Sequence, residues 1–463
     1  MKIVVLGAGI SGLATAWWLV KEGLDVTILE KNPEPGGSMI SRSEEGFLVD
    51  YGPNSGLETT PVISQLAEET GIKSEMIYAN EASANRYILR NGILHVLPTG
   101  PSAFLKTRLF SGMAKLRLFA EPFIGRSRDG YYQSISEFVK RRLGKEFLDY
   151  AIDPFVSGVF AGNPDKLSVK SAFPKLYRLE ELYGGLIKGM VRGAKERKRN
   201  PEKAKNTARM FSFKQGIQTL PAAIAHRLKD NIIYDCQING IKRSSDGYQI
   251  SYDRSGSQEN TNADILVSAL PAWELAILMK DYDPELSGHL QSIYYPPVKV
   301  LYLGYRKEDI ERELDGFGFL IPSKEKKLFL GAIWSSVIFP ERAPEGCASF
   351  TLFIGGARSP EMTAVDSEII NELVIDEFSS IMGINKPPVF IREKLWDKAI
   401  PQYNTGYIEH ENYFDEFEKK NAGFILTGNY RGGISVGDCV KNSVETGRKI
   451  INIKGSKNVT HKQ

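Results

Sequence analysis

The sequence predicts an α/β protein, α+β overall, and residues 1–30 carry the clearest pattern. Residues 2–6 form a short apolar run rich in β-branched side chains, and the sequence GAGISG follows at once at 7–12. A helical pattern then runs from Leu13 to Glu22, and a second apolar run at 26–29 ends in Glu30. Strand, glycine-rich turn, helix and strand in this order predict a parallel β-α-β unit.

The residue types in this turn suit a bound dinucleotide. Gly7 permits the tight turn, Gly9 lets the backbone approach a pyrophosphate, and Gly12 lets the helix pack on the strand. The N–H groups and the dipole of the helix N-terminus attract the diphosphate, and Glu30 can accept hydrogen bonds from ribose hydroxyls. A purely structural turn is the alternative, but the acid at the right distance favours a Rossmann-type site. The residues that we expect around it are Gly7, Gly9, Ile10, Ser11, Gly12, Glu30 and Lys31.

Length and composition predict a multidomain, soluble, globular protein. The 463 residues are too many for one ordinary core, so two or three domains are expected. Hydrophobic residues make up 42% and charged residues 25%, as in globular proteins. The net charge of +3 points to no particular partner, and the basic stretches lack the aromatic residues that accompany nucleic-acid binding.

The cysteines, the histidines and the hydropathy argue against a disulfide-rich, metal-binding or membrane-spanning protein. The three cysteines (Cys236, Cys347 and Cys439) are too few and too far apart for a disulfide framework, which fits a reducing compartment. The five histidines show no metal-ligand spacing, so we expect no metal site. We expect no signal peptide, since the first strand begins at residue 2, and no apolar run approaches the ~18 residues that span a bilayer. We therefore expect a cytoplasmic protein.

Two loops after Glu30 are expected at the same cofactor. Residues 31–38 end in a second glycine pair that would run beside the pyrophosphate. The sequence DYGPN at 50–54 is ordinary turn chemistry, but its position after a dinucleotide unit favours a loop at the cofactor edge. The residues expected there are Gly36, Gly37, Ser38, Gly52, Pro53 and Asn54.

The middle of the chain has a different texture. Residues 105–124 carry an amphipathic, basic helical pattern. A helix with its apolar face on the core is slightly favoured over direct membrane contact. Residues 192–205 are strongly basic and predict a solvated loop or helix end near anionic lipid head groups.

Strand patterns dominate the rest of the chain. Residues 232–243 predict strand, turn and strand, 248–252 a half-exposed strand, and 263–271 a buried strand that runs into a turn. Several apolar runs within 294–353 predict a sizeable mixed sheet that forms a substrate-binding floor. A helix is expected at 366–382, and strand, glycine-rich turn and helix at 423–451.

Three separated motifs resemble flavoproteins of the amine oxidase and phytoene desaturase superfamily. They are the N-terminal GAGISG with Glu30 and GGS, the SALP turn at 268–271, and LTGNYRGG…VGDC near the C-terminus. The resemblance implies FAD, with backbone N–H groups at a helix N-terminus near flavin N1 and the C2 carbonyl. Relatives often have an acid at the position of Asn429. The further cofactor residues that it implies are Ile238, Ala269, Trp396, Gly428, Asn429, Val436, Gly437 and Asp438.

A longer series of motifs is similar to the protoporphyrinogen oxidase family. Asn85–Gly92, SGVFAGNP at 157–164 and IPQYN at 400–404 occur in that order, and the resemblance runs to about residue 452. It implies an oxidoreductase acting on CH–CH groups late in haem biosynthesis. FAD N5 would take hydride from a porphyrinogen in a six-electron, three-step oxidation, with O₂ as acceptor and hydrogen peroxide released. We assign no catalytic base.

The resemblance also implies four substrate residues. Arg86 would bind a propionate, since a guanidinium gives bidentate and always-charged recognition; its alternative is a surface arginine. Leu320 and Phe339 would hold the ring, although both are slightly better explained as core residues. Gly162 would let a backbone carbonyl approach the macrocycle, and a plain turn glycine is an equal alternative.

The same resemblance implies a division into domains and a set of partners. Segments 1–85, 209–285 and 390–455 are expected to form an FAD-binding domain, and 86–104 with 286–389 a mixed-sheet substrate domain. Residues 105–208 would form an inserted helical segment for membrane association or substrate passage, and 456–463 a polar tail. Peripheral contact with the cytoplasmic face of the membrane, handover to a ferrochelatase and a homodimer are left open.

Three alternatives to protoporphyrinogen IX oxidation remain at this point. Coproporphyrinogen III has two more carboxylates, and the sequence shows no clear second basic pocket. Another flavin amine oxidase or a carotenoid desaturase is a second alternative. Residues 429–433 hold a single aromatic residue rather than the aromatic cage of amine oxidases. A non-catalytic flavin-binding protein is the third.

Overall fold

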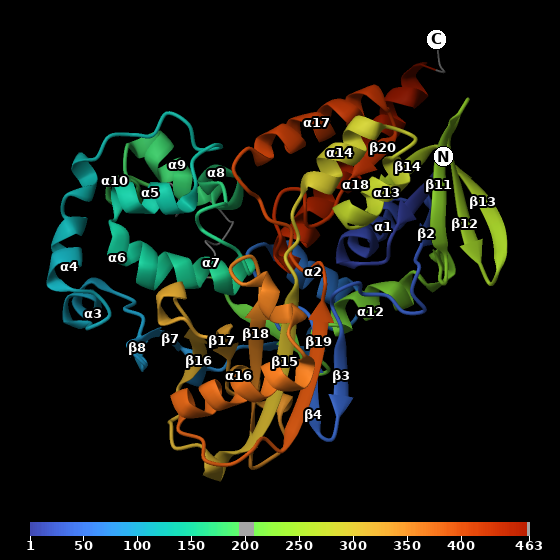
Figure 1. Ribbon diagram of the computed structural model, residues 1–463. Coiled ribbons are helices and arrows are strands. Elements are labelled where there is room, and N and C mark those ends of the chain that lie inside the picture. Colours follow the sequence, from blue (N-terminus) through green and yellow to red (C-terminus); the bar gives the residue numbers. More distant parts are fainter. Residues whose placement is uncertain (194–207, 461–463) are drawn as a thin grey trace.

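The computed structural model describes residues 1–193 and 208–460 (Figure 1). Most of the basic stretch at 192–205 lies outside the described residues. Three regions stand apart in Figure 1: a nucleotide-binding unit near both termini, a large sheet at the bottom and a helical segment at the left. No helix among the described residues is long and apolar enough to cross a membrane.

The predicted N-terminal unit is the centre of a five-stranded parallel sheet. Its strands come from three distant parts of the chain, in the order β10-β2-β1-β14-β20. Alternate side chains of β1 enter two different cores: Val4 and Leu6 face one, Ile3 and Val5 the other. Both faces are therefore covered, which explains the continuous apolar runs. The strand bounds are β1 Lys2–Leu6, β2 Asp25–Leu29, β10 Ile232–Ile233, β14 Ile265–Ser268 and β20 Phe424–Leu426.

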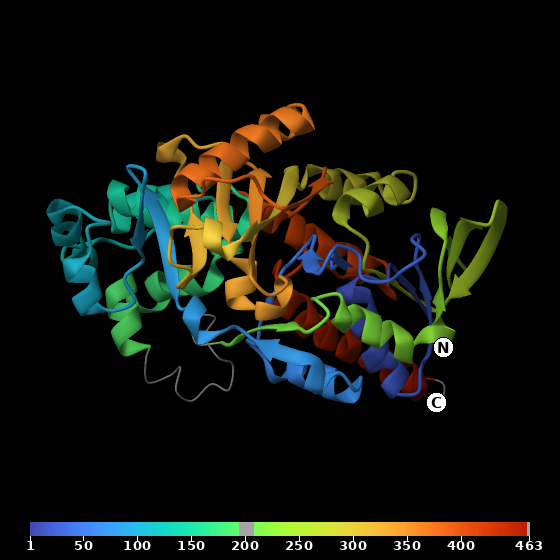
Figure 2. The same cartoon turned by 90° about the horizontal axis from the view of Figure 1, so that it is seen from below.

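Helices from both ends of the chain cover this sheet. On one face α1 and α18, the dark-blue and dark-red helices of Figure 2, pack against each other. Residues of α13, α14 and α17 contribute to the core of the other face. The bounds are α1 Ile10–Lys21, α2 Pro61–Glu69, α12 Thr219–Arg227, α13 Ala272–Met279, α14 Pro284–Ser292, α17 Tyr407–Lys420 and α18 Val436–Thr460. The strand, turn and helix expected at 423–451 are confirmed.

A seven-stranded mixed sheet forms the second large layer, as the apolar runs predicted. Its order is β19-β15-β18-β17-β16-β7-β8, and only β7 and β16 run parallel. Helix α16 (Ser367–Met382), capped by Asp366, packs its Ile370, Val374 and Phe378 on one face. The strands are β7 Asn85–Arg90, β8 Ile93–Val96, β15 Val298–Arg306, β16 Gly316–Leu320, β17 Phe329–Ile333, β18 Cys347–Gly355 and β19 Phe390–Trp396.

Short sheets complete the strand inventory. The strands β11, β12 and β13 form an antiparallel sheet, and burial alternates along β12 as expected of a half-exposed strand. The strands β3 and β4 pair with each other, and β5, β9 and β6 form a third small sheet. The bounds are β3 Ser41–Glu44, β4 Phe47–Asp50, β5 Gly56–Leu57, β6 Met76–Tyr78, β9 Met210–Phe213, β11 Gln237–Ser244, β12 Gly247–Arg254 and β13 Ser257–Ala263.

The helical segment is held by a buried charge cluster. Arg142 is fully buried and donates from Nη1 to Glu121 at 2.6 Å and from Nε to Glu180. Buried charges need such pairing, so this cluster fixes how the helices meet. The helices are α3 Pro101–Lys106, α4 Gly112–Leu118, α5 Ile135–Arg142, α6 Lys145–Phe147, α7 Asp153–Phe160, α8 Val169–Ala172, α9 Pro174–Tyr183 and α10 Leu186–Arg192.

The prediction of one amphipathic helical stretch at 105–124 was wrong in its continuity. Helix α3 ends at Lys106 because Thr107 is extended, and α4 begins after Ser111, whose hydroxyl caps the N–H of Ala114. A 3₁₀ turn follows at 121–123. Residues 109 and 110, between the helices, are buried, so the apolar residues of the pattern divide between a small core and the surface.

A buried ion pair connects the β3–β4 hairpin to the large sheet. Asp50 Oδ2 accepts from Arg342 Nε at 2.9 Å, and both side chains are about 1% exposed. Arg342 also donates to Ser212 Oγ at 2.7 Å, while Asp50 Oδ1 accepts from Ser41 Oγ at 2.6 Å and from the Ile217 N–H at 3.1 Å. Arg392 connects the same two parts at the surface through Glu44 and Glu45.

Replacing Arg342 by methionine should lower the free energy of unfolding by about 3–5 kcal/mol, because Asp50 would remain as an uncompensated buried charge. Arg392→Met is the matched control, and loss of its surface pairs should cost at most about 1 kcal/mol. Urea unfolding followed by tryptophan fluorescence measures both values. Equal losses in the two variants would contradict the central role of the buried pair.

Candidate functional site

The three glycines of the first turn have different surroundings. A Cβ on Gly12 would lie 2.0 Å from the Gly7 carbonyl oxygen, so Gly12 permits the close contact of helix and strand. Gly7 has φ +95°, which favours glycine. A Cβ on Gly9 would meet no protein atom within 4 Å. The chain itself therefore needs Gly7 and Gly12, whereas Gly9 faces space that a ligand can fill.

Glu30 is buried and already oriented at the carboxyl end of β2. Its carboxylate accepts from the Ala8 N–H at 2.7 Å and from the Asn32 N–H at 2.9 Å. Its own N–H donates to Ile233 O and its carbonyl accepts from the Cys236 N–H. A carboxylate fixed in this way can still accept from ribose hydroxyls through its remaining lone pairs.

Lys31 and Ile238, two further residues expected at the cofactor, have contacts within the chain. The Lys31 ammonium pairs with Glu274 at 2.5 Å, so its side chain is engaged on α13. Ile238 is buried in β11, shortly after Cys236. Their predicted contacts with the cofactor stay predictions.

The second glycine pair lies against the first turn. The Gly36 N–H donates to Ala8 O at 2.9 Å, and a Cβ on Gly37 would lie 3.4 Å from the Gly9 Cα. The DYGPN turn joins them, because a Cβ on Gly52 would lie 1.8 Å from Ser38 O. Three loops that the sequence placed at one cofactor are thus brought together.

The SALP turn and the last helix complete this arrangement. The Ala269 N–H donates to Leu6 O at 2.9 Å, and Ala269 packs on Gly12. Helix α18 begins at Val436, and the N–H groups of Val436 and Gly437 find no acceptor in the described part of the chain. Asp438 differs from expectation, since its N–H donates to Ser435 Oγ at 3.1 Å and its carboxylate accepts from the same hydroxyl. Ser435 and Asp438 therefore cap the helix.

These features fit a bound dinucleotide. The glycine turn at 7–12 leaves open space at Gly9, and the helix N-termini at Ile10 and Val436 offer N–H groups that have no acceptor among the described residues. The buried carboxylate of Glu30 stands at the end of β2, beside the first turn. The N–H donors suit an anion and the carboxylate acceptor suits sugar hydroxyls, which is the chemistry of a dinucleotide diphosphate.

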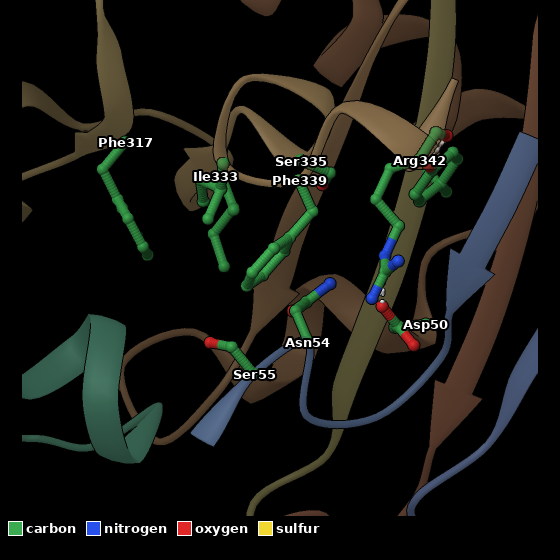
Figure 3. A pocket seen from close by; sticks show the side chains of 10 residues that line it. Asp50, Asn54, Ser55, Phe317, Ile333, Ser335, Phe339 and Arg342 are labelled. Atoms are coloured by element: carbon green, nitrogen blue, oxygen red, sulfur yellow. Dashed lines mark hydrogen bonds and ion pairs between the residues drawn. The ribbon is translucent and has the colours of Figure 1, made fainter. Parts of the chain in front are cut away.

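A hollow opens between the DYGPN turn and the large sheet (Figure 3). Phe317 and Phe339 point into it from above, and Asn54 and Ser55 lie opposite. The cavity itself is small, about 10 Å³, and the larger 280 Å³ of empty space around it includes open solvent. Its lining residues are Asp50, Asn54, Ser55, Tyr302, Phe317, Ile333, Ser335, Ile338, Phe339 and Arg342.

Trp396, expected at the cofactor, supports the loop beside this hollow. Its indole Nε1 donates to Tyr51 O at 2.8 Å, so it holds the DYGPN turn. Asn54 Nδ2 reaches Thr351 Oγ1 at 3.4 Å, and Thr351 Oγ1 lies 2.8 Å from Ser335 Oγ. The turn is thereby tied to the opposite wall of the hollow, where Ser335 lies beside Phe339.

Arg86 lies next to the hollow, beside the ring of Phe317. It is exposed on β7, and its guanidinium stands 5.3 Å from the centre of the Phe317 ring. Within the described residues no carboxylate pairs with it. An unpaired arginine beside an aromatic wall is available to bind a ligand carboxylate.

Leu320 and Gly162 belong to the boundary between sheet and helical segment. Leu320 is half-buried, pairs with Ile88 in register, and meets α7, since a Cβ on Gly158 would lie 2.5 Å from it. A Cβ on Gly162 would lie 2.8 Å from Gln402 Oε1 and 2.9 Å from Leu167. Gly162 is thus required for contact within the chain, and its approach to a substrate stays a prediction.

The structure brings Phe339 to the hollow but adds residues that sequence reasoning missed. Phe317, Ser335 and Arg342 belong to this group. Phe317 sits in an apolar run that predicted only a strand, and the sequence does not show which residue pairs with Arg342.

A second arginine, Arg358, holds helix α7. It lies 3.6 Å from Asp153 and donates to Ser157 Oγ at 2.8 Å.

No metal site is formed by the described residues. Within 1–193 and 208–460, no group of three or more histidine, cysteine, aspartate and glutamate side chains could hold an ion. Two of the five histidines contact each other instead: His289 Nδ1 and His410 Nδ1 are 2.9 Å apart. Burial and His289 lower the pKa of His410. These two histidines serve packing.

Comparison with known proteins gives consistent matches. The family described as flavin containing amine oxidoreductase matches residues 10–451. Protoporphyrinogen oxidase 2 of Arabidopsis thaliana is 33% identical, covering 97% of this chain and 94% of the relative. Coproporphyrinogen III oxidase of Bacillus subtilis is 28% identical and covers 95% of each chain.

Solved structures share the fold. A crystal structure from Exiguobacterium sp. 255-15 superimposes with a TM-score of 0.80 at 22% identity, covering 97% of this chain and 98% of that one. Reduced UDP-galactopyranose mutase gives a TM-score of 0.75 at 18% identity, covering 98% and 96%. At these identities the likeness concerns the fold alone.

Gly9→Ala should fold normally but retain at most about a tenth of the wild-type flavin, since only a bound diphosphate occupies that space. Gly9 has φ −72°, which alanine adopts without strain. Gly12→Ala is the contrasting variant and should lower the melting temperature, because its Cβ meets the Gly7 carbonyl. Flavin absorbance per chain and thermal unfolding separate the two. A fully flavinated Gly9→Ala protein would refute this placement.

Proposed function

The chain belongs to the flavin-containing amine oxidoreductase family, and from this premise we propose that it is an FAD-dependent porphyrinogen oxidase. Relatives named for porphyrinogen oxidation match nearly its whole length. The favoured reaction is oxidation of protoporphyrinogen IX to protoporphyrin IX in haem biosynthesis, with O₂ as acceptor and release of hydrogen peroxide. The proposal depends most on Arg86, whose guanidinium stands beside the aromatic wall of the hollow and has no carboxylate partner within residues 1–193 and 208–460.

Each part of the site has a task in this reaction. Bound FAD supplies hydride acceptance at N5. The loops at 7–12 and 36–38 and the start of α18 hold its diphosphate and flavin ends. Phe317 and Phe339 give a flat apolar substrate ring its contact surface and exclude water. Arg86 orients the ring through a propionate. No side chain is assigned as a base.

The charge of the hollow favours the substrate with fewer carboxylates. Arg342 is committed to Asp50, whereas Arg86 has no recorded ionic partner among the described residues. One available guanidinium suits the two propionates of protoporphyrinogen better than the four of coproporphyrinogen. Coproporphyrinogen III stays the alternative, because relatives of comparable coverage carry that name.

We also propose peripheral attachment to the cytoplasmic face of the membrane through the helical segment. Its outer surface exposes large apolar side chains: Phe123 is 89% exposed, Met113 76% and Phe119 69%. Lys106 and Arg108 are near them in sequence and attract anionic head groups. An apolar product would be retained there for handover to a ferrochelatase.

Purified protein should oxidise protoporphyrinogen IX aerobically, with coproporphyrinogen III oxidised more slowly. Porphyrin fluorescence and peroxide formation report the two products, and a protein-free sample measures spontaneous oxidation. If neither porphyrinogen is oxidised faster than in that sample, the proposed function fails. Faster turnover of coproporphyrinogen III would reverse the proposed substrate preference but leave the proposed porphyrinogen oxidase activity standing.

Arg86→Ala should raise the KM for protoporphyrinogen about 10- to 100-fold while the flavin content stays near that of the wild type, because a charged hydrogen bond is lost. Arg392→Met serves as a control for removal of an arginine outside the hollow. Loss of bound FAD in Arg86→Ala would assign a structural role to Arg86 instead.

Sedimentation with vesicles containing anionic lipid tests the membrane proposal. The wild type should sediment with them, and a Phe119→Ser, Phe123→Ser double variant should remain largely in the supernatant. Ile277→Ser, which removes a similarly exposed (71%) apolar side chain from α13, should behave as wild type. Recovery of the wild type in the supernatant would exclude this attachment.

A further inference from the structure

Two stacked tyrosines lie under the C-terminal glycine-rich loop at 428–433. Tyr403 follows the IPQ sequence, and Tyr407 is the first residue of α17. Their ring centres are 4.3 Å apart at an interplanar angle of 23°, and both side chains are buried. A buried phenol needs a hydrogen-bond partner, so the position of each hydroxyl group decides what it holds.

Both hydroxyl groups bond to the backbone of that loop. Tyr403 Oη donates to Asn429 O at 2.7 Å and accepts from the Gly433 N–H at 3.0 Å. Tyr407 Oη donates to Tyr430 O at 2.6 Å. Asn442 Nδ2, on α18, donates to the next carbonyl, Arg431 O, at 2.8 Å. Side chains therefore hold three consecutive loop carbonyls.

Holding a carbonyl also fixes the direction of an N–H group. In a planar trans peptide the N–H points opposite to the C=O of the preceding residue. Anchoring Asn429 O and Arg431 O thus turns the N–H groups of Tyr430 and Gly432 away from the anchoring side chains. These two N–H groups find no acceptor in the described part of the chain. The Arg431 N–H, by contrast, closes the turn on Gly428 O at 3.1 Å.

The loop stands at the correct edge of the sheet for these donors to meet a ligand. It follows the carboxyl end of β20, and the first glycine turn follows the carboxyl end of β1 in the same parallel sheet. Thr427 N–H donates to Ser268 O, which places the start of the loop next to the SALP turn. Ligands of open α/β sheets bind outside this edge.

We infer that Tyr403 and Tyr407 are positioning residues for the 428–433 loop. Through Asn429 O, the Tyr403 hydroxyl turns the Tyr430 N–H toward the ribityl-diphosphate chain of FAD. Through Tyr430 O, the Tyr407 hydroxyl holds the peptide whose Arg431 N–H closes the turn on Gly428 O. The inference rests on the proposed function for the identity of the cofactor. Neither tyrosine needs to touch FAD. Phenylalanine at either position would keep the stack but leave a buried carbonyl without its donor, and the loop would lose its fixed orientation.

Hydrogen bonds of the neighbouring backbone hold the segment that carries Tyr403 in place. The backbone of Tyr403 accepts from the Ser168 N–H at 2.8 Å, and Gln402 Nε2 donates to Phe160 O at 2.8 Å. The segment is therefore anchored to the end of α7 and to α8. It connects the 428–433 loop to the helical segment.

Release of FAD from purified holoprotein tests this inference without substrate. After dilution, free FAD fluorescence should rise about tenfold faster in Tyr403→Phe and in Tyr407→Phe than in the wild type, equivalent to about 1.4 kcal/mol. Tyr413→Phe is the matched control. It removes a hydroxyl group of α17 that donates to Asp283 at 2.9 Å, away from the loop, and should release FAD at the wild-type rate.

Further readouts separate positioning from general loss of structure. The melting temperatures of all three variants should fall within the same few degrees, and the flavin circular dichroism should change only in Tyr403→Phe and Tyr407→Phe. Holoprotein of those two should keep a KM for porphyrinogen near wild type, unlike Arg86→Ala. Wild-type release rates in both variants, or equally fast release from Tyr413→Phe, would overturn the inference. A wild-type protein that holds no FAD would instead refute the proposed function.

Discussion

The buried pair of Asp50 and Arg342 is the constraint on which the arrangement of the site depends. Asp50 ends β4, directly before the turn at the cofactor edge, and Arg342 follows Phe339 on the opposite wall. Burial raises the pKa of the Asp50 carboxyl, and Arg342 opposes that shift. Because neither charge can be left alone in this environment, the two walls of the hollow are held at one separation.

Backbone N–H groups without acceptors among the described residues likewise mark the cofactor site. Glycines bring loops from distant parts of the chain into backbone contact, and helix N-termini and the 428–433 loop then present N–H groups that the described chain does not satisfy. A folded chain seldom leaves such donors without partners. Their convergence at one sheet edge, beside the buried carboxylate of Glu30, matches a diphosphate joined to a ribose.

An arginine and a glycine hold the helical segment against the large sheet. Arg358 ties α7 to the sheet by its contacts with Asp153 and Ser157, and Gly158 admits Leu320 between them. Burial lowers the pKa of Arg358 and raises that of Asp153. The helical segment is thereby fixed to the site, while large apolar side chains such as Phe119 and Phe123 remain exposed on its surface.

The sequence by itself determined the local elements and the cofactor chemistry. Glycine spacing, an acid at a strand end and the strand-turn-helix patterns depend on short-range geometry, so the elements containing 7–12, 263–271 and 423–451 were predictable. It failed at 105–124, where Thr107 and Ser111 interrupt a periodic pattern. Tertiary structure alone decided which partners meet: Asp50 with Arg342, Arg86 with Phe317, and Tyr403 with the 428–433 loop. These contacts join residues that are far apart in the chain. Local propensities depend on neighbouring residues only, so they cannot predict which distant side chains meet.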